Sequence, residues 1–249
     1  MKNLVAIVLI ALMLSSKFVV AQAVVGDPNQ YEASWRLKQV IRDKLNVQER
    51  SNPIEFSDIK GSPYLNESFK DGQYFLNGKS QGHFYIRYNV YNDQIEILTD
   101  VSPENFNSKT PKYDAFLKSN NSKIVLDGKT IKSYYYNDDN GNTTNSYFIE
   151  VNTTDKYTLL VRKRCVLTPA EKAATPNQAD RAARFTIYDD YYMLDKNEQY
   201  PRKIEPKQRK LLKTFPAKAD ALKDYIKKER INLKEEDDLI KLTNYMSTI

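Results

Sequence analysis

The sequence has little of the chemistry that most enzymes use. Among 249 residues there is one histidine, His83, and one cysteine, Cys165. A hydrolase with an imidazole base would have to use His83, and zinc sites rich in histidine are excluded. His83 follows Gly82 at the start of a predicted strand, where we expect a surface imidazole. A single cysteine also excludes an intramolecular disulfide, and strand alternation predicts that Cys165 is a small buried apolar residue.

Motifs for catalysis and ligand binding are missing as well. The sequence contains no G-x-S-x-G turn for a nucleophilic serine. Gly78, Lys79 and Ser80 resemble the end of a phosphate-binding loop, but Gln73 stands where that motif needs its first glycine. Residues 137–142 are oxygen-rich, yet tyrosines occupy the first and last ligand positions of a calcium loop. We therefore predict turns at both places and no catalytic, cofactor-binding or metal-binding residue, hence no cofactor.

Long hydrophobic runs are absent except at the N-terminus. Residues 4–14 are uninterruptedly apolar, follow a short basic region and precede small residues that offer cleavage after Ala21 or Ala23. These features are typical of a secretory signal peptide. The run is shorter than the ~20 residues that a membrane-spanning helix needs. We predict a signal peptide at residues 1–21 and a periplasmic or secreted protein with no transmembrane segment after cleavage; a retained membrane anchor is the alternative.

The charge is modestly positive. Removal of Lys2 and Lys17 with the signal peptide lowers the formal net charge from +6 to +4, since residues 1–21 contain no acid. In an intracellular protein such an excess would favour nucleic acid as a partner. After export, the polyanions within reach are lipid head groups and cell-surface polysaccharides, so no nucleic-acid partner is predicted.

Alternating apolar residues and turn sequences dominate the middle of the chain. Residues 24–60 are predicted as a leader with one short helix at 35–45. Residues 61–204 contain short strands separated by turn residues. No intervening stretch has room for a parallel crossover, so the strands are predicted to form an antiparallel meander. Residues 169–180 lack alternation and are predicted as a surface loop.

Two hairpins carry the most specific local patterns. In residues 84–98, a two-residue turn at Asn92 and Asp93 would place Val90 opposite Ile95 and bring the apolar faces together.

The second hairpin covers residues 123–131. Here Asp127 and Gly128 are predicted as a two-residue turn that places Ile124 opposite Ile131.

The C-terminal residues 205–249 change from strand spacing to helix spacing. Apolar residues recur at helical intervals within 207–215, 217–229 and 235–246, which predicts three helices with Lys and Arg on their outer faces. The apolar stripes are narrow, so these helices should pack on each other and against the sheet. The predicted fold class is α+β: an antiparallel sheet region with a short N-terminal helix and a helical C-terminal segment.

Carboxylates and tyrosines are the remaining candidates for function. Asp189 and Asp190, next to several tyrosines, are the most suggestive acids for glycoside hydrolysis. Adjacent strand residues point to opposite faces, which argues against a shared groove. The run of three tyrosines at 134–136 should place at least one ring outward, where it could stack on a sugar or a peptide, although cross-strand packing is the simpler interpretation.

Several segments together resemble a known kind of protein. They are Gly61-Ser-Pro-Tyr-Leu-Asn66 with Phe69, Gly82, residues 87–96, residues 156–160, Lys210-Leu-Leu, residues 222–226 and residues 236–240. In this order they are similar to a family of uncharacterised exported proteins of Bacteroidetes-type bacteria, over residues 60–246. The shared motifs are structural rather than chemical, so the resemblance implies export and assigns no activity to any residue.

These observations favour a non-catalytic cell-envelope protein that binds or scaffolds another macromolecule. The alternatives from the sequence are a carboxylate-based hydrolase acting on polysaccharide and a small lipid-binding barrel, which would need an apolar cavity.

Overall fold

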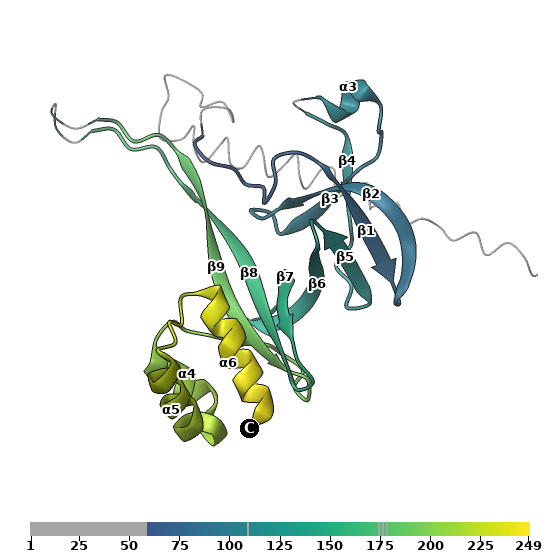
Figure 1. Cartoon of the computed structure of the whole chain (residues 1–249). Coiled ribbons are helices and arrows are strands. Elements are labelled where there is room, and N and C mark those ends of the chain that lie inside the picture. The colour runs from purple at the N-terminus through teal and green to yellow at the C-terminus, as the bar shows by residue number, and fades with distance from the viewer. Residues whose placement is uncertain (1–58, 109, 174, 176, 178) are drawn as a thin grey trace, which may run out of the picture.

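A computed structural model of the chain describes residues 59–108, 110–173, 175, 177 and 179–249. Ten strands form one antiparallel sheet (Figure 1). They are β1 (Lys70–Leu76), β2 (Lys79–Asn89), β3 (Gln94–Leu98), β4 (Tyr113–Ala115), β5 (Ser122–Leu126), β6 (Lys129–Asn137), β7 (Thr143–Thr153), β8 (Tyr157–Thr168), β9 (Arg184–Asp195) and β10 (Arg202–Lys203). The helices are α3 (Pro103–Phe106), α4 (Gln208–Thr214), a 3₁₀ turn (Pro216–Lys218), α5 (Ala219–Glu229) and α6 (Glu236–Thr248).

The α+β class predicted from the sequence is wrong. The described chain is mostly one large sheet, and only about 20% of it is helix, mainly at the C-terminus. The physical reason is that strands pair continuously from one end of the sheet to the other, so the helices cover part of this sheet instead of forming a second layer of equal weight. The helix predicted at residues 35–45 and the signal peptide lie outside the described residues.

The sheet consists of two meanders joined side by side. Strands β1 to β4 and β5 to β10 each follow chain order, and β1 pairs with β5 at the junction. Gly72 lies in the middle of β1, opposite Leu126 of β5. A Cβ atom at Gly72 would lie 3.0 Å from Ile86 Cδ1 and 3.2 Å from Leu126 Cδ1. Glycine therefore permits the close approach at the junction.

Beyond this junction the sheet curls onto itself. Buried side chains of β2 and β3, such as Ile86 and Ile95, share one core with Ile131 of β6 and Tyr147 of β7. The Tyr88 and Tyr147 rings meet edge to face with centroids 6.0 Å apart. Apolar side chains thus fill the space enclosed by the curl, where a lipid-binding barrel would need a cavity.

The first predicted hairpin has the right strands and the wrong register. Tyr88 pairs with Ile95 and Asn89 with Gln94, so four residues connect the strands instead of two, and the pairing of Val90 with Ile95 is wrong. The shift is by two residues, which keeps each side chain on its predicted face. Only Asp93 of the two proposed turn residues has positive φ, at 52°.

The second hairpin is confirmed. Ile124 pairs with Ile131, and Asp127 and Gly128 connect the strands with φ of 51° and 72°. Both positive angles are those that a two-residue turn with the twist of a β-ribbon requires.

Strands β8 and β9 form a long ribbon that leaves the rest of the sheet (Figure 1). They pair from Tyr157 with Asp195 to Thr168 with Arg184, whereas β7 pairs with β8 only as far as Val161. β9 is thus one strand of twelve residues, longer than the short strands predicted for this part of the chain.

The three C-terminal helices are confirmed within two residues at their ends. Their buried residues Leu222, Leu239 and Leu242 share a core with Leu159 and Met193 of the ribbon. The helices thus pack on one another and on one end of the sheet, as their narrow apolar stripes predict. Within the described residues, none of the helices has the length and apolar character to span a bilayer.

Candidate binding groove along strand β6

His83 does not belong to a catalytic constellation in the described structure. It lies on β2 with an exposed ring, and its Nδ1 atom is 3.0 Å from Asp71 Oδ2. Both side chains are more than 60% exposed, which is the setting of a surface ion pair. Across the part of the chain that the structure describes, no three His, Cys, Asp or Glu residues gather as metal ligands would.

Cys165, on β8, is half-buried and packs against both the curled core and a small cluster formed by Ile59, Ala183 and Phe185. Burial raises the pKa of its thiol to about 11. The thiolate is the reactive form of cysteine, so the raised pKa lowers the reactivity of Cys165 at neutral pH. Its contacts with the two clusters are those of a packing residue.

The carboxylates of Asp189 and Asp190 point away from each other on β9. Asp189 pairs with Lys163 at 2.7 Å, and Asp190 with Arg164 at 2.9 Å. The two acids therefore do not line one groove, as strand alternation predicts. Each is engaged by its own cation, which removes support from the carboxylate-pair hypothesis.

The oxygen-rich loop at residues 137–142 is a turn whose side chains accept hydrogen bonds from its own backbone. Asp138 Oδ1 accepts hydrogen bonds from the backbone N–H groups of Asn140 and Asn142 at 2.9 and 2.8 Å. Asp139 pairs with Lys203 of β10 at 2.9 Å, and this hydrogen-bonded cation lowers the pKa of the Asp139 carboxyl. The predicted turn is confirmed.

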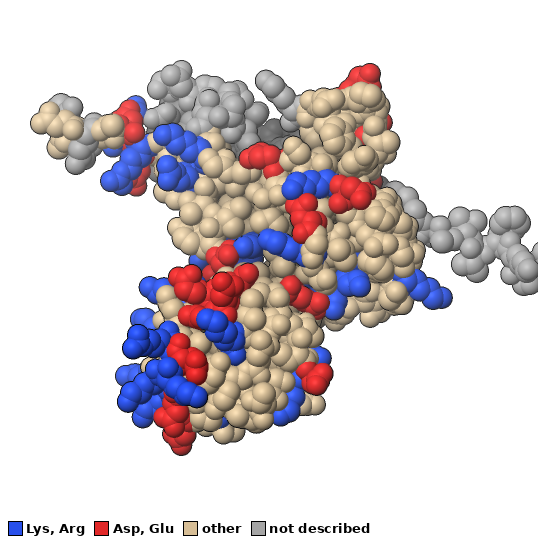
Figure 2. Space-filling model, in the orientation of Figure 1, with Lys and Arg blue, Asp and Glu red and all other residues tan. Residues whose placement is uncertain are grey.

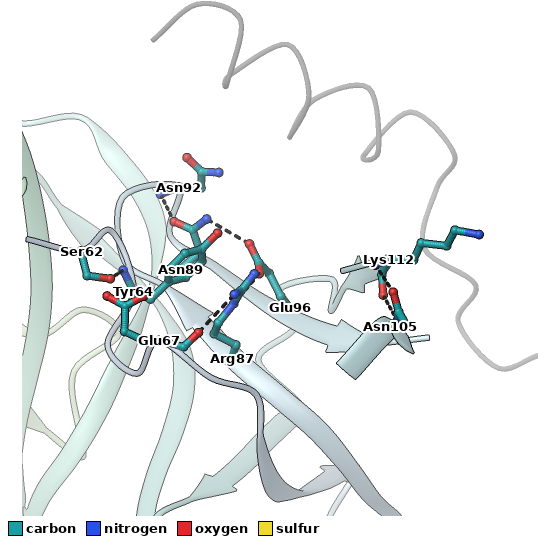
Figure 3. Close-up of polar contacts among 9 residues, drawn as sticks. All are labelled: Ser62, Tyr64, Glu67, Arg87, Asn89, Asn92, Glu96, Asn105 and Lys112. Atoms are coloured by element: carbon teal, nitrogen blue, oxygen red, sulfur yellow. Dashed lines mark hydrogen bonds and ion pairs between the residues drawn. The ribbon is translucent and has the colours of Figure 1, made fainter. Parts of the chain in front are cut away.

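An unpredicted ion pair lies inside the first meander (Figure 3). The Glu96 side chain is fully buried and accepts hydrogen bonds from Arg87 Nε and Nη2 at 3.0 and 2.6 Å. Its second oxygen accepts from Asn89 Nδ2 at 3.0 Å. The guanidinium carbon lies 3.8 Å from the centre of the Tyr64 ring and 4.4 Å from that of Phe69. This closed network has no access for a substrate, so its role is structural.

The face of the molecule drawn in Figure 2 carries charges of both signs. On this face, basic and acidic side chains are mixed over α4 and α5, whose outer faces the sequence predicted to carry Lys and Arg. Arg209 and Lys213 belong to α4, and Asp220 and Asp224 belong to α5. Such mixing is expected of a solvated surface and gives little attraction for a polyanion.

Strand β6 has an open edge. Its register with β5 ends at Ile131, although β6 continues to Asn137. On the other side, β7 pairs with β6 all the way to Asn137. Residues 132–137 therefore have a strand partner on one side only, within the described chain.

The direction of the free peptide groups follows from the confirmed turn. Leu126 and Lys129 flank a two-residue turn and so form a hydrogen-bonded pair, as do Ile124 and Ile131 two residues further. The same alternation directs the N–H and C=O groups of Ser133 and Tyr135 away from β7, toward the side where β6 has no strand partner within the described chain. The Asp138 N–H donates to Asn142 O across the β6–β7 loop. Even-numbered residues thus direct their peptide groups toward β7, which agrees with odd-numbered Ser133 and Tyr135 directing theirs to the other side.

A groove runs along this edge. One cavity of about 340 Å³ is lined by Asn120, Lys132, Ser133, Tyr134, Tyr135, Gln199 and Tyr200. A second of about 390 Å³ is lined by Asn137 and by the residues from Glu198 to Lys203. The two share Gln199 and Tyr200, so they adjoin, and we call them together the β6 groove.

The lining of the β6 groove is polar, aromatic and locally neutral. Lys132 pairs with Glu150 at 2.7 Å, and Glu198 pairs with Arg202. Burial, followed by the hydrogen bond to Glu150, raises the pKa of the Tyr134 hydroxyl, so this tyrosine stays protonated. Tyr135 leaves 46% of its surface exposed, which confirms that one ring of the tyrosine run points outward.

Ser133 is the most unusual residue in the groove lining. It is 2% exposed, and its hydroxyl has no hydrogen-bond partner within the described residues. A buried hydroxyl without a partner costs free energy, so such groups usually have a reason in structure or function.

The sequence contains one sign of this groove that pattern analysis missed. β5 is short because Asn120 and Asn121 precede it and the turn at Asp127 and Gly128 follows it. Alternation in β6 continues to residue 137. Two strands of unequal length joined by a tight turn predict an unpaired stretch in the longer one.

Comparison with protein families, with curated proteins and with solved structures finds no match for this chain, so the geometry alone carries the functional argument.

Proposed function

We propose that this is an exported, non-catalytic envelope protein that holds a partner macromolecule in the β6 groove. The observation that carries the proposal is the groove itself: two adjoining cavities beside an unpaired strand edge, with the exposed ring of Tyr135 in the lining. Concave sites with aromatic rings and a few placed polar groups are typical of binding surfaces.

The acids around the groove support binding over hydrolysis. Glu150 accepts from Lys132 and from the Tyr134 hydroxyl, Asp139 is paired with Lys203, and Glu198 with Arg202. A general acid of a glycosidase needs a raised pKa, and the cation beside Asp139 lowers the pKa of that carboxyl. These contacts favour a site that recognises a partner without transforming it.

The local neutrality of the groove indicates what kind of partner fits. The exposed side chains of Asn120 and Gln199 and the ring of Tyr135 line the groove. Such groups match the hydrogen-bonding and stacking surfaces of uncharged polymers, whereas an anionic polymer would need unpaired cations. The partner is therefore expected to be an uncharged polar chain.

The test is binding of the secreted mature protein to a panel of neutral oligosaccharides and to a displayed library of linear peptides. We expect at least one class to bind, and the Tyr135→Ala variant to bind it at least tenfold more weakly. The matched control is Tyr188→Ala, since Tyr188 is an equally exposed tyrosine (47%) on the ribbon outside the groove. Binding by neither class, or equal loss in both variants, would refute the proposal.

A further inference from the structure

We propose that the partner is an extended peptide segment that adds as a strand to the open edge of β6. This inference rests on the proposed function and names its ligand class. The edge runs from Lys132 to Asn137, where β7 pairs on one side and the ladder with β5 on the other side has already ended at Ile131. Peptide groups of a sheet edge are a template for another strand.

A second opening in the same sheet, beside β7, is covered by side chains. The register of β7 with β8 begins at Ile149, which leaves the preceding part of β7 unpaired on that side. There the Tyr147 N–H donates to Asp93 Oδ1 at 3.2 Å, and the Asn145 C=O accepts from Lys118 Nζ at 3.2 Å. Charged side chains from the other meander thus satisfy the free peptide groups of β7.

The open edge of β6 differs from the gap beside β7 in its contacts with side chains. In the described chain no side chain donates to or accepts from the backbone of Ser133 or Tyr135 on the side of β5. Ser133 and Tyr135 also line the groove, so within the described residues this edge lies beside a cavity. An edge that is uncapped and beside a cavity is a place where main-chain hydrogen bonds of a ligand can form.

The groove also restricts which peptides fit. Lys132, Glu198 and Lys203 are already paired with opposite charges, so charged residues of a peptide would find no partner among them. Side chains of an added strand alternate between two faces, and one face would meet the exposed ring of Tyr135. The expected ligand is an uncharged segment with aromatic or hydroxyl-bearing residues at alternate positions.

The first test uses peptides selected from the displayed library on the wild-type protein. Each backbone N–H of the best binder is replaced in turn by N-methyl, and the dissociation constants are measured by titration calorimetry. Strand addition predicts losses of at least tenfold at every second residue and little change at the residues between. Uniform losses, or no loss at any position, would overturn the inference.

The second test changes the edge itself. The Tyr135 N–H points to the open side, so Tyr135→Pro removes a donor for the ligand without removing a bond to β7. Tyr135→Ala is the matched control, because it removes the same ring and keeps the N–H. We expect the proline variant to bind at least tenfold more weakly than the alanine variant, and equal affinities would contradict strand addition.

The outcomes separate the inference from the proposed function. An oligosaccharide that binds wild type, loses affinity in Tyr135→Ala and is not matched by any selected peptide would leave the groove as a binding site and refute strand addition. Should Tyr135→Pro fail to fold, as judged by its thermal transition, the N-methyl series on the wild-type protein decides.

Discussion

The buried pair of Arg87 and Glu96 allows a quantitative test of the fold. Glu96→Ala removes a carboxylate whose side chain is 0% exposed and leaves the guanidinium of Arg87, 10% exposed, with two donors unsatisfied. Only the Glu67 carbonyl, 3.2 Å from Nη1, would remain as an acceptor. Removing one partner of a buried ion pair costs about 3–5 kcal/mol. This is a large part of the ~5–15 kcal/mol that stabilises a typical domain.

Urea denaturation followed by circular dichroism measures this cost. With a slope of about 2 kcal/mol per molar urea, the midpoint should fall by about 2 M in Glu96→Ala. The control is Asp71→Ala, which removes the exposed partner of His83 and should change the free energy of unfolding by less than about 1 kcal/mol.

The double variant Arg87→Met/Glu96→Leu tests the reasoning itself. If the cost comes from leaving one charge buried without its partner, removing both charges should cost less than the sum of Arg87→Met and Glu96→Leu alone. Additive effects, or a Glu96→Ala variant within about 1 kcal/mol of wild type, would refute the claim that the network depends on the paired charges.

Three further predictions concern other parts of the chain. Cys165, with its thiol pKa raised to about 11, should react with iodoacetamide at pH 8 about a hundredfold more slowly than free cysteine, and a comparable rate would contradict its burial. Leu242→Ala empties a fully buried position between the helices and the ribbon and should cost about 2–5 kcal/mol by urea denaturation; a loss below about 1 kcal/mol would mean that the helices are not docked there. Protein recovered from the producing cells should begin at Gln22 or Val24 by N-terminal sequencing, and Met1 on cytosolic protein would overturn export.

Local patterns in this sequence predicted local structure well. The hairpin at Asp127 and Gly128 has its predicted turn and register, because two positive φ angles and matched apolar faces require the same pairing. The hairpin after Asn89 failed in register because a four-residue connection serves the same faces as a two-residue one. Alternation defines which face a residue occupies and does not define how far the strands slide in steps of two.

The larger errors concern contacts between distant segments. Nothing in the pattern around Gly72 or Leu126 says that β1 pairs with β5, so the join between the meanders and the curl of the sheet were beyond local reasoning. Glycine in the middle of a strand was the available sign, since it marks a close approach whose partner only the folded chain reveals. The fold class was wrong for the same reason: continuous pairing across the join makes one large sheet, which leaves the helices a minor part.

The groove was beyond prediction because it arises where strands stop pairing. The two outer edges of the sheet are short, with three residues in β4 and two in β10, as expected where a protein avoids pairing with its neighbours. The gap beside β7 is covered by Asp93 and Lys118. The edge of β6 is longer than either outer edge and is not covered in this way within the described chain. Strands β2, β8 and β9 also extend beyond one of their partners, and the edge of β6 combines unpaired peptide groups with an adjacent cavity lined by Ser133 and Tyr135.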